Sequence, residues 1–216
     1  VREQINDSLS GAFGRPFSYE RLAPSVFRNL EVFGLEIAGP RGETLRIDQA
    51  RISYSILAIL RGDVRSVVDR LIIEDAVLEI DFTRDEEFIR TVRRNLFGRG
   101  IFPTDLAISL RGVEIRLVQE RFILALTNIA GEVELRDPEI YADLQSRVRF
   151  QTIGESPLEL ESQVALQGST ARGFEQVDGE VALGRLFGSH LVLDPLSFDF
   201  SKSGEGWSVT KQRDAY

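Results

Sequence analysis

The sequence predicts a mainly β protein with few helices (α+β), built as a long antiparallel β-meander with one apolar face. From Asp105 onward, apolar residues alternate with polar or small ones in segment after segment, which is the period of a half-buried strand. Short turn sequences such as Arg111-Gly112 separate these segments, so neighbouring strands are expected to be antiparallel, because a parallel crossover needs a dozen or more residues. Helical spacing is confined to the first half of the chain.

The composition is that of an ordinary globular protein and excludes several function classes. Of the 216 residues, 43% are apolar and 28% are charged, which argues against disorder. The net charge is −8 and arginines are interleaved with acids, so no nucleic-acid partner is expected. There is no Cys, which rules out disulfides and thiolate metal sites. There is no Met either, so we expect a fragment whose upstream segment is missing.

The first forty residues predict a helix followed by a bent strand. Ile5, Leu9 and Phe13 share one helical face, and Gly14 and Pro16 end the helix. In the strand that follows, the apolar positions change parity at Gly34. A glycine inside a strand together with a parity change predicts a β-bulge.

The stretch from Thr44 to Phe82 predicts a strand, a short apolar helix near 55–61, and two further strands joined by a tight Glu74-Asp75 turn. The helix carries four large apolar residues before Gly62: Ile56, Leu57, Ile59 and Leu60. So many apolar side chains on so short a helix predict that it plugs the core at one end of the sheet.

A second, amphipathic helix is predicted over residues 84–97. Thr83-Arg84-Asp85-Glu86 has the spacing of a capping box, and Phe88, Val92 and Leu96 form one apolar stripe. We expect this stripe to cover the adjoining face of the sheet. The chain is interpreted as one elongated β-rich domain over 1–216, with a mixed α/β head at 1–103 and the meander at 104–216.

The meander poses a physical problem, because its apolar face cannot remain in water. Burying each large side chain stabilises by roughly 1.5–3 kcal/mol, and soluble monomers rarely expose apolar patches above a few hundred Å². The sheet can close into a barrel, fold over as a sandwich, or curl into an open trough that meets an apolar ligand. Periodicity alone does not choose among the three.

The candidate binding residues are the apolar positions of the first meander strands, selected by alternation. They are Leu78, Ile80, Leu106, Ile108, Leu110, Val113, Ile115, Leu117, Phe122, Leu124 and Leu126. The chain carries no catalytic or metal-binding pattern. Its single His follows Ser189 at His190, and the acids Asp85-Glu86-Glu87 suit a helix start. No enzyme activity, cofactor or metal is expected.

The central stretch resembles the N-terminal region of the AsmA-like/TamB family. Similar features are a strand ending in Tyr54-Ser55, a short Leu-rich helix ending at Arg61-Gly62, and the phrase Leu71-Ile72-Ile73-Glu74-Asp75-Ala76-Val77-Leu78-Glu79-Ile80. The segment Gly11-Ala12-Phe13-Gly14-Arg15-Pro16-Phe17 also looks like the family's segment after its membrane anchor. The resemblance covers about residues 1 to 82, and the rest only through its generic meander.

The resemblance implies a periplasmic protein anchored in the inner membrane of a diderm bacterium. It implies a β-sheet trough that carries phospholipid toward the outer membrane, with acyl chains on the apolar lining. The implied partners are an outer-membrane barrel protein of the Omp85 type, reached through a missing C-terminal part, and the inner membrane, reached through a missing N-terminal helix. The resemblance implies no catalytic residues for this chain.

Three functional hypotheses therefore remain. The first is a lipid-conducting trough that links the two membranes. The second is a scaffold or chaperone that offers a sheet edge to outer-membrane barrel strands, as in autotransporter assembly. The third is a closed sandwich or lipocalin-like binder of a small apolar ligand.

Overall fold

The fold is known from a computed structural model. It describes residues 16–24, 29–39, 42–61, 67–97, 105–136, 138–154, 157–171, 176–188, 191–204 and 206–212. The helix predicted for residues 1–13 lies outside these ranges, as do Ser189 and His190.

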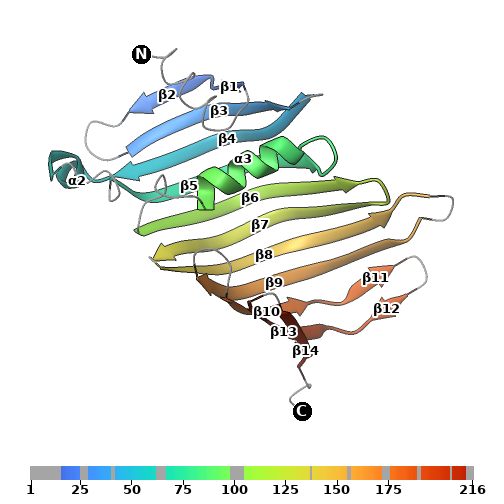
Figure 1. Ribbon diagram of the computed structural model, residues 1–216. Helices are drawn as coiled ribbons and strands as arrows, with labels where there is room; N and C mark the ends of the chain where they lie inside the picture. The colour runs from blue at the N-terminus through green and yellow to red at the C-terminus, as the bar shows by residue number, and fades with distance from the viewer. Residues whose placement is uncertain are drawn as a thin grey trace.

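The protein is mostly β and forms one open, curled 14-stranded sheet (Figure 1). The strands are β1 (Phe17–Ser18), β2 (Arg21–Pro24), β3 (Asn29–Gly39), β4 (Gly42–Tyr54), β5 (Val68–Asp81), β6 (Asp105–Gln119), β7 (Phe122–Arg136), β8 (Glu139–Thr152), β9 (Glu159–Ala171), β10 (Gln176–Leu183), β11 (Leu186–Gly188), β12 (Val192–Leu193), β13 (Leu196–Ser203) and β14 (Gly206–Lys211). The helices are α2 (Ile56–Arg61) and α3 (Glu86–Phe97). The main path of the sheet runs β1-β3-β4-β5-β6-β7-β8-β9-β10-β13-β14.

The sheet is not antiparallel throughout, which corrects the predicted meander. β5 pairs with β6 in parallel, whereas every other strand pair in the described residues is antiparallel. The chain between β5 and β6 contains α3, and this connection is long enough to return the chain to the end at which β5 began. The prediction failed here because the short-turn argument does not apply across a helical insertion.

Two predicted turns are bends inside long strands. Glu74-Asp75 lies within β5 and Arg111-Gly112 lies within β6, each in an unbroken strand. Asp75 and Gly112 adopt positive φ angles of 53° and 64°, a conformation that is common in turns and that also lets a strand bend. Gly34 likewise has φ 58° inside β3, but the strand keeps its register with β4 there, so the bulge predicted at Gly34 is wrong. The register shift lies between Ile37 and Ala38.

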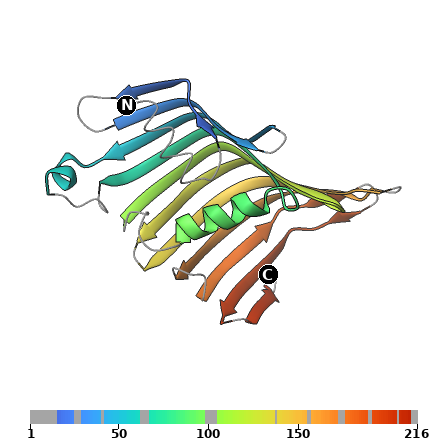
Figure 2. The ribbon, with the colours of Figure 1, turned by 45° about the horizontal axis from the view of Figure 1, so that its top comes forward.

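Helix α3 begins two residues later than the sequence predicts. The helix starts at Glu86, and Asp85 precedes it as the cap, so the Thr83 capping box is wrong. The Asp85 carboxylate accepts a hydrogen bond from Asp81 N at 2.8 Å, and Asp81 in turn accepts from Thr83 N and Arg84 N. Phe88 is buried in the main hydrophobic cluster, and α3 lies over one face of the sheet (Figure 2). The side chains of Val92 and Leu96, the rest of the predicted stripe, lie outside the described set.

Helix α2 does not plug the core. Its residues Leu57 and Leu60 are 63% and 77% exposed, and the helix lies beyond the end of β4, away from the sheet face (Figure 1). Ile56 and Ile59 share this position in the chain, but their side chains lie outside the described set. The plug prediction is wrong for Leu57 and Leu60, because apolar spacing shows which residues are hydrophobic and not where the helix lies.

Candidate functional site

One face of the sheet is apolar from β3 to β14. Residues paired directly across strands point to the same side, so the registers trace each face from strand to strand. Val32 of β3 pairs with Ala50, Ala50 with Ile73, and Ile73 with Leu110, so these residues share one side of the sheet. The same side continues across the later strands. We call this side the apolar face and the opposite side the polar face.

All eleven candidate residues lie on the apolar face. Leu78 and Ile80 pair with Ile115 and Leu117, which pair in turn with Leu126 and Leu124. The remaining candidates occupy the same side of β6 and β7: Leu106, Ile108, Leu110, Val113 and Phe122. The structure therefore brings together every residue selected from alternation.

Part of this face is already used by the protein's own core. The buried cluster consists of Val32, Ile37, Ile47, Ala50, Ala76, Val113 and Ile129, together with Tyr19 and Phe88. Leu110, Ile115 and Leu126 pack against it. The candidates nearest α3 are thus structural, and they are poorly placed to meet a ligand.

The apolar face continues beyond the buried cluster over β8 to β13, where its side chains are half-buried. These positions are Ile140, Leu144, Val148, Phe150, Leu160, Leu166, Val181, Leu183, Leu196, Phe198 and Phe200. Alternation marks them as clearly as it marks β6 and β7, yet they were absent from the predicted site. The position of α3 decides which strands of the apolar face remain open. The sequence does not show which strands α3 covers, so these positions were not selected.

Phe200 fills a gap in this open part of the apolar face. Gly168 and Gly179 pair directly across β9 and β10, and Phe200 pairs with Gly179. A Cβ added at Gly179 would lie 2.5 Å from Phe200 Cζ. The ring therefore lies against two residues without side chains, which keeps the surface smooth and apolar at this point.

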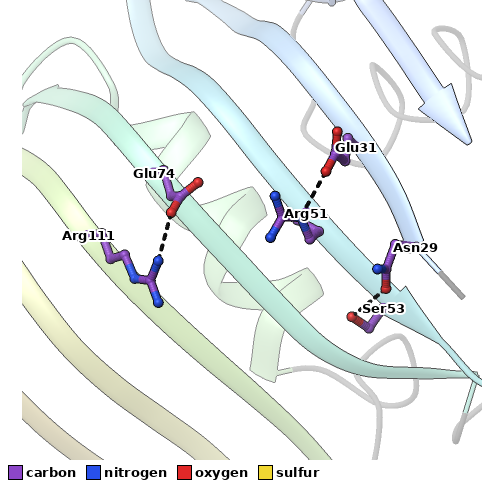
Figure 3. A network of polar contacts seen from close by, with 6 residues as sticks. All are labelled: Asn29, Glu31, Arg51, Ser53, Glu74 and Arg111. Atoms are coloured by element: carbon purple, nitrogen blue, oxygen red, sulfur yellow. Dashed lines mark hydrogen bonds and ion pairs between the residues drawn. The ribbon is translucent and has the colours of Figure 1, made fainter. Parts of the chain in front are cut away.

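The polar face carries rows of ion pairs between neighbouring strands. Arg51 pairs with Glu31 at 2.9 Å and Arg111 with Glu74 at 3.0 Å, while Ser53 donates to Asn29 at 3.0 Å (Figure 3). Further pairs join Arg116 to Glu79, and both Arg147 and Arg149 to Glu161. These exposed pairs contribute little each, but they show that this side faces water.

The polar face also contains a shallow acidic hollow of about 690 Å³ across β7 to β10. Its lining includes the carboxylates Glu132, Glu134, Asp143, Asp178 and Glu180. Within the described ranges, no group of three or more potential metal ligands is placed to hold an ion. An open hollow lined by this many carboxylates repels anions.

No helix in the described part of the chain is long and apolar enough to cross a membrane.

The acids Asp85, Glu86 and Glu87 lie at the start of α3, where Glu86 pairs with Arg90 at 2.6 Å. Their role there is to start the helix, as the sequence indicated.

A comparison with protein families matches residues 1–102 to TP_0324_N, a family described as an N-terminal domain. The match covers less than half of the chain and ends between α3 and β6. No curated protein matches the chain.

Proposed function

We propose that this protein carries lipid along the apolar face of its curled sheet, with the sheet acting as an open trough for acyl chains. The observation that supports this most directly is the open part of the apolar face over β8 to β13. A soluble protein rarely leaves so continuous an apolar surface uncovered, and such a surface is typical of a binding site.

Electrostatics favour an acyl chain as the ligand. Paired strand positions on the apolar face carry no Asp or Glu, whereas the polar face carries the ion pairs. A hydrocarbon chain needs no hydrogen-bonding partner and gains roughly 0.8 kcal/mol for each buried CH₂. The open edge of the sheet would leave a polar headgroup in water.

The cellular role follows from the resemblance of residues 1 to 82 to the AsmA-like/TamB family. In this proposal the protein lies in the periplasm, anchored to the inner membrane of a diderm bacterium, and conducts phospholipid toward the outer membrane. An Omp85-type barrel protein would be its outer-membrane partner. The protein would act by binding and would catalyse no reaction.

A neighbouring pair of residues on β8 provides the test. Leu144 is half-buried on the apolar face, and Gln145 is exposed on the polar face. In native mass spectrometry of gently purified protein, we expect phospholipid to co-purify with the wild type and with Gln145→Glu. Leu144→Glu should remove it, because a carboxylate there meets the acyl chain.

Circular dichroism would confirm that both variants keep their strand content. Equal phospholipid on both variants, or none on the wild type, would contradict the proposal.

A second function is favoured by the last strand. Among the described residues, β14 pairs only with β13, so its outer backbone groups are available to another strand. All six of its residues are exposed. This supports a scaffold that binds barrel strands by β-augmentation, which site-specific crosslinking from Ser208 to a barrel protein would detect.

A further inference from the structure

Both lysines of the chain lie on the apolar face, on the neighbouring strands β13 and β14. The sequence contains only Lys202 and Lys211, against 24 arginines. Lys202 pairs with Trp207, and Lys211 pairs with Phe198, which places both lysines on the apolar side of β13 and β14. Arginines at paired strand positions in the described ranges instead point to the polar face.

Apolar and aromatic side chains lie next to these lysines, of which Lys211 is exposed on the edge strand. Lys202 is half-buried and also pairs with Val177 of β10, and its Nζ lies 5.8 Å from the centre of the Trp207 ring. Phe200 and Val209 lie between the two lysines. Because the lysines are offset by four positions along the ladder, about 13 Å separates them.

We infer that Lys202 and Lys211 are two points, about 13 Å apart, at each of which the headgroup of an anionic amphiphile binds while its acyl chain lies on Phe198, Phe200 and Val181. This inference rests on the proposed function and deepens it by naming the ligand's charge. In a protein of net charge −8, the charged side chains at paired positions of the apolar face are all cations within the part of the chain that the structure describes. A flexible lysine suits a phosphate or carboxylate that moves along the face, whereas arginine holds it in one fixed geometry.

The alternative is that the lysines protect the open edge of the sheet. Charged residues that point inward on edge strands, lysine above all, prevent edge-to-edge pairing between copies. This alternative predicts a change in oligomeric state on removal of the charges and no preference among ligands, so the two roles are separable by experiment.

Trp207 is the single tryptophan of the chain and is 63% exposed, so its fluorescence reports on this site directly. The experiment titrates the protein with dodecyl phosphate and with dodecylphosphocholine, both below their micelle concentrations. The two probes share one alkyl chain and differ in headgroup charge. We expect dodecyl phosphate to bind about tenfold more tightly, because a charge-assisted contact contributes about 1.4 kcal/mol or more.

The variants K202Q and K211Q should remove this preference, because they should weaken the binding of dodecyl phosphate more than that of dodecylphosphocholine. R116Q, which removes one positive charge from the polar face, should keep the preference. Inorganic phosphate should compete weakly, because it lacks the chain; strong competition would assign the site to free phosphate and overturn the inference.

Two further outcomes have distinct meanings. Equal binding of the two probes, or K202Q and K211Q proteins that only self-associate in size-exclusion chromatography, would overturn the headgroup site and leave lipid carriage intact. Failure of both probes to bind would contradict the proposed function itself.

Discussion

Residues with left-handed backbone conformations form a row across the sheet. Gly34, Asp75, Gly112 and Asn128 have φ angles of 58°, 53°, 64° and 53°, and the registers place them close to one line across β3, β5, β6 and β7, with β4 between the first two and contributing no such residue. The most buried apolar residues lie next to this row. We interpret the row as the crease along which the sheet curls over its apolar face.

The crease is testable at Gly112. A Cβ added there would lie 2.6 Å from Asp75 Oδ1, and the residue would keep a positive φ. Gly112→Ala should therefore lower the free energy of unfolding by about 1–2 kcal/mol, measured by urea denaturation.

Gly154→Ala is the matched control, since no atom lies within 4 Å of its added Cβ. It should change the unfolding free energy by less than about 0.5 kcal/mol. Equal effects of the two substitutions would count against the crease.

These same residues explain where prediction from sequence stopped. The parity change at Gly34 was visible because apolar residues flank it on both sides. Asp75 and Gly112 instead carried the signal of a turn, since a turn and a bent strand require the same positive φ. Only the pairing of neighbouring strands distinguishes the two, and one sequence does not contain that information.

At the scale of elements, the two helices differ in how they contact the sheet, although both contain several apolar residues. The buried residue Phe88 attaches α3 to the sheet, whereas the described leucines of α2 are exposed. Phe88→Ala should cost about 3–5 kcal/mol of stability. Leu57→Ser with Leu60→Ser should cost less than about 1 kcal/mol, as thermal and urea unfolding would measure; a large loss would restore the plug interpretation.

The start of α3 offers a second element-level prediction. Asp85 is 5% exposed and its carboxylate accepts from Asp81 N, so Asp85→Ala should destabilise by about 1–2 kcal/mol. Thr83→Ala should be nearly neutral, because Thr83 is exposed in the turn before the helix. A capping-box role for Thr83 would reverse this order in the denaturation midpoints.

Both helix positions were predictable, since apolar spacing and turn residues mark them well. The faces they contact were predictable only for α3, whose stripe is longer and one-sided. α2 is too short for its spacing to select a face, and its position beyond the end of β4 depends on the path of the chain into β5.

For the whole molecule, the separation of chemistry between the two faces is the central feature. Alternation predicted the apolar face and its eleven candidate residues, all of which share one side. It did not predict the open region over β8 to β13, because coverage by α3 is a tertiary property. The parallel β5–β6 pair was missed because the short-turn argument does not apply across the helical connection between these strands.

The most direct test of lipid carriage is photo-crosslinking in living cells. A photoreactive phenylalanine analogue would replace Leu144 on the apolar face or Gln145 on the polar face, in the full-length protein, and bound lipid would be detected by mass spectrometry after ultraviolet irradiation. We predict phospholipid adducts at position 144 and none at position 145. Adducts at both positions alike, or at neither, would contradict the account.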